Sequence, residues 1–248
     1  MIINADDYGK DEMTTNAIIE AFRRGCITQT TLMVNMPFAD RAVALAREKG
    51  FAEHVGLHLN LTEGRPLTPA MAECSTFCDR SGVFKGKFPP QLDMVSVAAM
   101  KAEIQAQIER FRSFKLPLLH CDGHHHAQNR RAIACILMSL LKEFGFRTIR
   151  RPCNVYPGRW RPHLRSRLGQ IRFALQARRN SLVASSDVFG GWTPAIERIV
   201  RRGMQTVEIM VHPGFDLSGT LVDVVDFRNG SGIPLDGIIP LRNEGRSK

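Results

Sequence analysis

Residues 2–24 read IINADDYGKDEMTTNAIIEAFRR, and this stretch contains the unit that decides the fold. Its apolar beginning, residues 2–5, predicts a strand that stops at two aspartates. Residues 14–24 then place apolar side chains at helical spacing, and Gly25 predicts the end of that helix. A strand followed at once by a helix is the unit from which parallel sheets covered by helices are built.

The same alternation of strands and helices continues along the chain. Further strands are expected at residues 29–34, 55–59, 118–121, 147–149 and 207–211. Further helices are expected at residues 39–48, 97–114, 131–144 and 194–202, and a long loop with turn signals at 62–92. The pattern predicts an α/β fold, a (β/α) barrel of parallel strands with outer helices, with an open doubly wound sheet as the alternative.

The composition excludes several classes of protein. With 44% hydrophobic residues the chain can bury a core, but its apolar runs are too short for a membrane span. Its beginning, MIINADDYGK, lacks the basic start and apolar run of a signal peptide, so we expect a cytoplasmic protein. The six cysteines are then expected to be reduced, and Cys74 and Cys78 have no second pair with which to form a zinc knuckle.

The net charge of +10 comes from one segment. Residues 150–202 contain twelve arginines, no lysine and only two acidic residues, Asp187 and Glu197, so the rest of the chain is neutral overall. Within residues 163–179 one helical stripe is apolar, and it consists of Leu164, Leu168, Ile171 and Leu175. We interpret this segment as a helix packed on the barrel with a solvated basic face; the alternative is a lid that recognises an anionic group. We expect no nucleic-acid partner, because no binding motif accompanies the arginines.

Polar residues cluster where the predicted strands end. Asp6 and Asp7 follow the first strand, His58 ends the third, and Arg150 and His212 end two later ones. The segment LLHCDGHHH, residues 118–126, adds the group His120, Asp122, His124, His125 and His126. In both candidate folds the carboxyl ends of the strands meet at one face, so we expect these side chains to converge there.

Converging imidazoles and carboxylates are what zinc and other divalent ions bind. Adjacent aspartates at the end of an apolar strand also repel each other unless a cation lies nearby. Each residue has a simpler interpretation by itself, since a single aspartate often caps a helix and a single histidine is often a hydrogen-bonded core residue. Several separate segments contribute such residues to the same end of the sheet, which favours a divalent metal site.

The segments IINADDYG, TTLMVN, VGLHLNLTEGRPL, HCDGHHH and EIMVHPG, in this order over residues 1–215, resemble those of the YdjC-type carbohydrate deacetylases. The resemblance implies a distorted (β/α) barrel of the polysaccharide-deacetylase type. It also implies removal of an acetyl group from an N-acetylated sugar, with one divalent metal, Mg²⁺ or Zn²⁺. The ligands carried over are Asp7, His58 and His124, and Asp6 resembles the catalytic base.

The chemistry of amide hydrolysis agrees with these roles. The bound metal is expected to activate a water, and Asp6 to take its proton. His212 is expected to protonate the leaving amine, although a His-Pro-Gly turn can simply end a strand. Arg150 is expected to pair with Asp6 and keep it ionised. The remaining residues, Asp122, His125 and His126, are expected to orient the ligands or contact the sugar.

Other polar residues near these segments keep two interpretations. Tyr8 is expected to be a packing residue at the edge of the site. Asn60 and Thr62 fit either contacts to sugar hydroxyls or the capping of a loop.

Two features depart from the family pattern. Residues 127–128 are Ala and Gln where the family often has a small apolar residue and a further His, so contacts to the substrate are expected to differ. The tail, about residues 216–248, has turn residues where a closing helix is expected. We expect residues 1–248 to form one domain, with a basic helical insertion at about 157–190 and this atypical tail.

A missing closing element would leave an apolar sheet edge, and we therefore expect a homodimer. The other expected partner is a small N-acetylated saccharide, and no membrane partner is expected. Two alternative functions are a metal hydrolase of another bond and a binding or regulatory protein that uses its arginine face for an anionic polymer.

Overall fold

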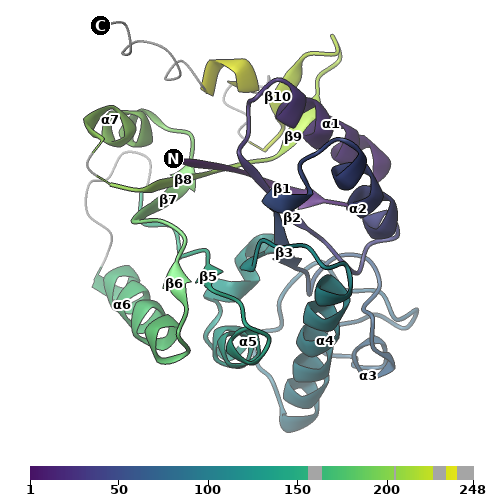
Figure 1. The fold of residues 1–248 in the computed structure, drawn as a ribbon. Coiled ribbons are helices and arrows are strands. Elements are labelled where there is room, and N and C mark those ends of the chain that lie inside the picture. The colour runs from purple at the N-terminus through teal and green to yellow at the C-terminus, as the bar shows by residue number, and fades with distance from the viewer. Residues whose placement is uncertain (156–163, 204, 226–232, 239–248) are drawn as a thin grey trace, which may run out of the picture.

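The computed structural model describes residues 1–155, 164–203, 205–225 and 233–238. Its centre is an eight-stranded parallel sheet with the strand order β6-β5-β4-β3-β2-β1-β8-β7. The strands are β1 (Ile2–Tyr8), β2 (Gln29–Leu32), β3 (Val55–Leu59), β4 (His120–Gly123), β5 (Thr148–Ile149), β6 (Val183–Ala184), β7 (Val188–Gly191) and β8 (Val207–Val211). The sheet curls into part of a barrel and is open between β6 and β7 (Figure 1).

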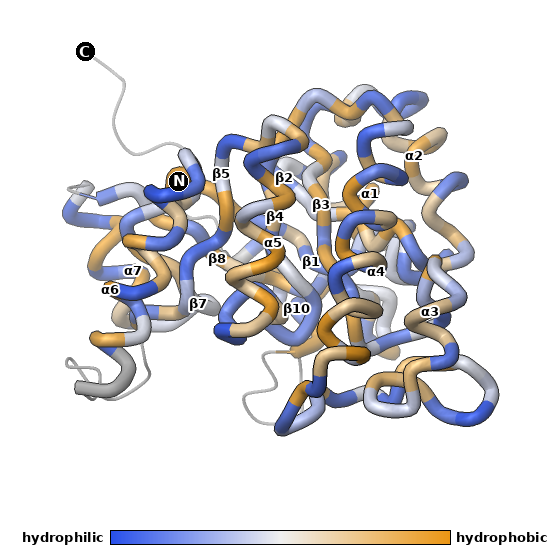
Figure 2. The backbone as a smooth tube through the Cα atoms, turned by 90° about the horizontal axis from the view of Figure 1, so that it is seen from below, coloured by the Kyte–Doolittle hydropathy of each residue, from blue (hydrophilic) through white to orange (hydrophobic). Residues whose placement is uncertain are grey.

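Helices surround this curled sheet (Figure 1). They are α1 (Glu12–Arg23), α2 (Ala39–Glu48), α3 (Pro69–Ala72), α4 (Met94–Ser113), α5 (Arg131–Glu143), α6 (Leu164–Arg179) and α7 (Pro194–Arg202). Hydrophobic residues run through the central strands and alternate with hydrophilic ones along the helices, as the amphipathic pattern requires (Figure 2). The predicted (β/α) barrel with parallel strands and outer helices is confirmed in this open form.

Local sequence signals set the ends of the helices. The carboxylate of Asp11 accepts a hydrogen bond of 2.7 Å from the backbone N–H of Thr14 and caps α1. Asp93 caps α4 through Ser96 in the same way. Gly25 has a φ of +70°, a left-handed conformation that ends the first helix at little steric cost. Each cap lets the chain turn between a strand and its helix.

Strands β6 and β7 were not expected from the sequence. They contain two and four residues, which is too short for a periodic apolar pattern to be visible. β8 pairs with β1 over residues 208–211 and with β7 on its other side, and among the described residues after Val211 no strand joins this sheet.

The described part of the tail forms a second, smaller sheet that does not pair with the central one. Strands β9 (Pro213–Phe215), β10 (Leu221–Asp223) and β11 (Ile233–Pro234) make a small antiparallel sheet. This sheet lies beside α1 (Figure 1), and Leu221 and Leu235 join the hydrophobic core. Residues 226–232 and 239–248 of the predicted tail lie outside the described residues.

Helix α6 differs from its prediction. The stripe that was expected to pack on the barrel points outward, because Leu168, Ile171 and Leu175 are exposed. Phe173 and Ala177 are buried instead and attach the helix to the core. The prediction that this aliphatic stripe packs on the barrel was therefore wrong, because the opposite side of the helix faces the core. Residues 156–163 of the predicted insertion lie outside the described residues.

None of the helices in the described part of the chain is long and apolar enough to cross a membrane.

Candidate active site

A cavity of about 390 Å³ lies at the carboxyl ends of the central strands. Seven of the ten residues expected to converge at the strand ends line it, namely Asp6, Asp7, His58, His124, His125, His126 and His212. Asp122 and Arg150 lie directly beneath them and are completely buried. His120 is buried without lining the cavity, and its Nδ1 lies 3.0 Å from the hydroxyl of Thr148. The convergence predicted from the strand ends is therefore present.

Asp7 contacts two histidines, one in β3 and one that directly follows β4. Its Oδ1 atom lies 3.1 Å from Nε2 of His58 and 2.8 Å from Nδ1 of His124. These three residues offer ligand atoms that all lie within 4.8 Å of one another. Burial alone would raise the pKa of Asp7, but the hydrogen bond with His124 and the nearby charges of His58 and His124 hold it well below its usual range. The carboxylate stays ionised, as a metal ligand must be.

His58 is oriented from behind by Asp122. The Nδ1 atom of His58 lies 2.7 Å from Oδ1 of Asp122, while Oδ2 of Asp122 accepts a hydrogen bond of 3.0 Å from the hydroxyl of Thr31. The carboxylate of Asp122 accepts a hydrogen bond from Nδ1 and so keeps the proton of the imidazole on that nitrogen. In the neutral ring, Nε2 therefore carries the lone pair, and it faces Asp7. Burial alone would lower the pKa of His58, but the charge and hydrogen bond of Asp122, with Asp7 and Asp6 nearby, raise it to about 10.

The donor set fits a divalent cation. Nε2 of His58 and Nε2 of His124 are buried and, although each lies near a carboxylate, neither makes a hydrogen bond of acceptable geometry with any described residue. Orphaned buried nitrogens are costly unless another group satisfies them. Two imidazole nitrogens and one carboxylate oxygen, with a carboxylate behind one imidazole, match the chemistry of a mononuclear metal site.

Two residues beside His124 were missed from the sequence. Oε2 of Glu63 lies 3.0 Å from Nε2 of His124 and 2.9 Å from Nζ of Lys10. Burial alone would lower the pKa of Lys10, but the hydrogen bond and charge of Glu63 raise it. Glu63 lies within the quoted segment VGLHLNLTEGRPL, so that segment contained the only signal for it.

Arg150 is the central cation beneath the cavity. Its NH1 and NH2 atoms each lie 2.8 Å from one oxygen of Asp6, and NH2 lies 2.7 Å from Oδ2 of Asp122. Its Nε donates a hydrogen bond of 2.5 Å to Glu208, and the ring of Phe189 lies 4.8 Å from the guanidinium carbon. A buried arginine is tolerated only when carboxylates neutralise it, and here three do so.

The pairing with Arg150 fixes the charge of Asp6. Burial alone would raise the pKa of Asp6, but the charge and two hydrogen bonds of Arg150 hold it far below its usual range. The side-chain amide of Asn4 donates a further hydrogen bond of 2.8 Å to Asp6. The expected ion pair between Arg150 and Asp6 is thus present in bidentate form.

His212 directly follows β8 at the edge of the site. It lines the cavity, and its Nδ1 lies 3.9 Å from Oδ1 of Asp223, which is beyond hydrogen-bond distance. The same oxygen accepts a hydrogen bond of 3.1 Å from the backbone N–H of His212. The backbone is therefore anchored, and the imidazole lines the same cavity as Asp6.

Three residues of the site have strained backbones. The φ angles of Asp7, His125 and His126 are 70°, 50° and 55°, in the left-handed region that non-glycine residues seldom adopt. Such conformations persist only where the surrounding structure imposes them, and they concentrate at functional sites. Here they direct one ligand and two neighbouring imidazoles at the cavity.

The contacts of Asn60, Thr62 and Tyr8 show the structural role of each residue. Asn60 is buried, and its Oδ1 accepts hydrogen bonds of 3.0 Å from the backbone N–H groups of Thr62 and Glu63, so it caps the loop. The hydroxyl of Thr62 lies 3.0 Å from Nδ1 of His125 and positions that ring. Tyr8 is buried, and its hydroxyl donates to the carbonyl of Ala42, in agreement with a packing role.

The chain resembles known proteins along most of its length. A family model described as YdjC-like protein matches residues 1–229. A carbohydrate deacetylase of Oceanobacillus iheyensis is 39% identical over 143 residues, which cover 57% of this chain and 60% of that protein. A carbohydrate deacetylase of Mus musculus is 34% identical over 160 residues, which cover 62% of this chain and 51% of that protein.

A third relative, a carbohydrate deacetylase of Thermoanaerobacter pseudethanolicus, is 34% identical over 136 residues, 54% of this chain and 53% of that protein. The matched part thus spans between half and three fifths of the length of these curated relatives. Among solved structures, a protein of Enterococcus faecalis described as a cellobiose-phosphate cleavage protein has the same fold. The TM-score is 0.62 at 24% identity, over 88% of this chain and 82% of that one.

Proposed function

The chain belongs to the YdjC-like protein family, and from that premise we propose that it is a metal-dependent hydrolase that removes an acetyl group from an N-acetylated sugar. The observation that carries the proposal is the convergence of Asp7, His58 and His124 beside Asp6, which Arg150 holds through both carboxylate oxygens. Three relatives that match between 54% and 62% of this chain are named carbohydrate deacetylases.

Asp7, His58 and His124 are the proposed ligands of one divalent ion, Zn²⁺ or Mg²⁺. Such an ion, when bound, would polarise the acetyl carbonyl and lower the pKa of a water from about 15.7 towards 7. Asp122 is the positioning residue for His58, since its hydrogen bond of 2.7 Å fixes the ring.

Asp6 is the proposed general base. Because both of its oxygens accept hydrogen bonds from Arg150, the carboxylate is ionised and fixed in orientation before the substrate arrives. The same pairing makes Asp6 a weak base. We therefore propose that Asp6 accepts the proton of the attacking water only transiently, in the transition state, and does not remain protonated afterwards.

His212 is the proposed general acid. It directly follows β8, the strand that pairs with β1, and it lines the same cavity as Asp6 and Asp7. The proton that it supplies goes to the nitrogen of the leaving amino sugar as the bond between that nitrogen and the acetyl carbon breaks. The products are acetate and the free amine.

The proposed substrate is a small N-acetylated saccharide, a chitooligosaccharide or a related amino sugar. A cavity of about 390 Å³ falls within the range of about 300–1,000 Å³ typical of small-ligand sites. His125 is exposed and His126 is half-buried at its rim, where they are placed to contact the sugar. We also keep the homodimer and the cytoplasmic location as proposals.

The test is release of acetate from N-acetylglucosamine and its short β-1,4 oligomers, with metal-free protein and with added Zn²⁺ or Mg²⁺. We expect metal-dependent release that is abolished in Asp6→Asn. Glu143→Gln is the matched control, because it removes one negative charge from an exposed position on α5 and is expected to keep full activity. Metal binding without release from any of these sugars would overturn the proposed substrate, and absence of metal binding would overturn the proposed site.

A further inference from the structure

Helix α6 carries an apolar stripe that faces away from the body of the protein. Leu168, Ile171 and Leu175 are 45%, 55% and 53% exposed, whereas Phe173 and Ala177 on the opposite side of the helix are buried. At 3.6 residues per turn the three aliphatic side chains fall in one narrow sector. The helix therefore has two apolar sides, and the core covers only one of them.

Arginines border this outer stripe on both sides. By helical periodicity, Arg167 and Arg178 lie along one edge and Arg172 and Arg179 along the other, and all four are exposed. The helix contains no acidic residue. An aliphatic strip between two rows of arginines is the pattern of a cationic amphipathic surface helix.

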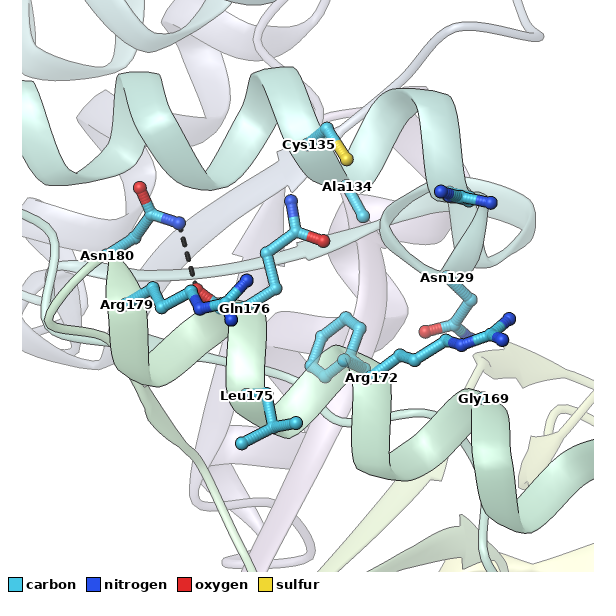
Figure 3. Close-up of a pocket in the computed structure, with 11 residues that line it drawn as sticks. Asn129, Ala134, Cys135, Gly169, Arg172, Leu175, Gln176, Arg179 and Asn180 are labelled. Carbon is cyan, nitrogen blue, oxygen red and sulfur yellow. Dashed lines mark hydrogen bonds between the residues drawn. The ribbon is translucent and has the colours of Figure 1, made fainter.

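A groove beside the stripe continues the positive surface. It has a volume of about 610 Å³ and lies between α5 and α6. Arg131 of α5 lines it together with Arg172 and Arg179, and none of the residues that line it is acidic. Figure 3 shows Arg172 and Arg179 along the groove, and Leu175 directed away from α5.

The occupant of this surface has to be anionic and has to accept aliphatic side chains. A second copy of the same face would set arginines against arginines, so charge disfavours self-association here. The stripe protrudes from the outer side of α6 and is not recessed in a groove. A folded partner would need a matching hollow, whereas a fluid acyl layer needs none.

We propose that the face formed by α5 and α6 docks peripherally on an anionic phospholipid bilayer. Phosphate headgroups accept hydrogen bonds from Arg131, Arg172 and Arg179, while Ile171 and Leu175 enter the boundary of the acyl chains. The arginine stems lie along the apolar surface and keep their charged ends at the phosphates. This contact departs from the expectation, made from the sequence, of no membrane partner, and it does not depend on the deacetylase activity.

Co-sedimentation of the full chain with vesicles tests the proposal. We expect binding to vesicles that contain phosphatidylglycerol and none to vesicles of phosphatidylcholine alone, with weakening as salt rises. The double variants Ile171→Ser/Leu175→Ser and Arg172→Gln/Arg179→Gln should each lower the partition constant about tenfold or more. All four positions are exposed, so circular dichroism should show unchanged folding.

Matched controls separate this face from a general effect of charge or apolar surface. Arg198→Gln/Arg202→Gln removes the same charge from α7, and Met94→Ser/Val95→Ser removes exposed apolar groups from α4. Both controls should bind vesicles as the wild type does. Equal loss in the α7 control, equal binding to neutral vesicles, or no binding to anionic vesicles would each overturn the proposal. The last outcome would favour an acidic protein as the occupant.

Discussion

The guanidinium of Arg150 meets the carboxylate of Asp6 through two hydrogen bonds of 2.8 Å, although the residues lie 144 positions apart in the chain. The same arginine also neutralises Asp122 and Glu208. One buried cation thus holds together three carboxylates from β1, β4 and β8. Arg150 therefore holds in place the proposed base, Asp6, and Asp122, which orients the proposed ligand His58. Through Glu208 it also holds β8, the strand that directly precedes His212.

Arg150→Met should therefore destabilise the protein strongly. Removing one partner of a buried ion-pair network leaves uncompensated charges and costs about 3–5 kcal/mol. Urea unfolding measures the change. Arg147→Met, at an exposed position just before β5, is the control and should change the free energy of unfolding by less than about 0.5 kcal/mol. A loss for Arg150→Met no larger than that of an exposed pair, about 1 kcal/mol, would contradict the central role.

Asp122→Asn should weaken metal binding with little effect on the shape of the site. The amide keeps the size of the carboxylate but loses the charge that fixes the His58 ring, and such losses typically cost about 10–100-fold in affinity. Competition with a zinc-chelating dye measures the dissociation constant. Unchanged affinity would show that Asp122 does not act through His58.

Metal affinity should rise with pH. Without metal, the pKa of His58 is about 10, so its imidazole is protonated at neutral pH and has to lose a proton before its nitrogen can bind a cation. Because binding of each ion then releases one proton, the apparent affinity below pH 10 should rise about tenfold for each unit of pH. Calorimetry in two buffers of different ionisation enthalpy counts the released protons. Release of no proton at pH 7 would refute this coupling.

His125 offers a direct test of backbone strain. Its φ of 50° costs an ordinary residue about 1–2 kcal/mol but costs glycine nothing. Both His125→Gly and His125→Ala remove the imidazole and its contact with Thr62. The glycine variant should nevertheless be more stable than the alanine variant by about 1 kcal/mol. Thermal unfolding compares the two, and equal stability would mean that this segment relaxes when the ring is removed.

The sequence predicted that these residues converge because the rule that it used is geometric. Asp6 and His58 lie in β1 and β3, and His124 and His212 directly follow β4 and β8; the carboxyl ends of parallel strands meet at one face whatever the details of packing. The metal role of this convergence stays a prediction, to be tested as described above.

The missed residues lacked a local signal. Glu208 lies inside an apolar strand, and its partner Arg150 is 58 residues away, so its role exists only in the folded protein. Glu63 follows a strand by several residues, and only the folding of its loop brings it to His124. The stripe on α6 illustrates a different limit: periodicity shows that one side of a helix is apolar but not whether that side faces the core.

The strand order has a consequence for how the protein assembles during synthesis. β1 pairs on one edge with β2, which follows it closely, and on the other with β8, which the ribosome makes about 200 residues later. A nascent chain that has emerged as far as Arg150 already contains every proposed ligand and the arginine beneath them, while the outer edge of β1 is still unpaired. The three proposed ligands can thus come together first, and the arrival of β8 then closes that edge, brings Glu208 to Arg150 and delivers His212 to the cavity.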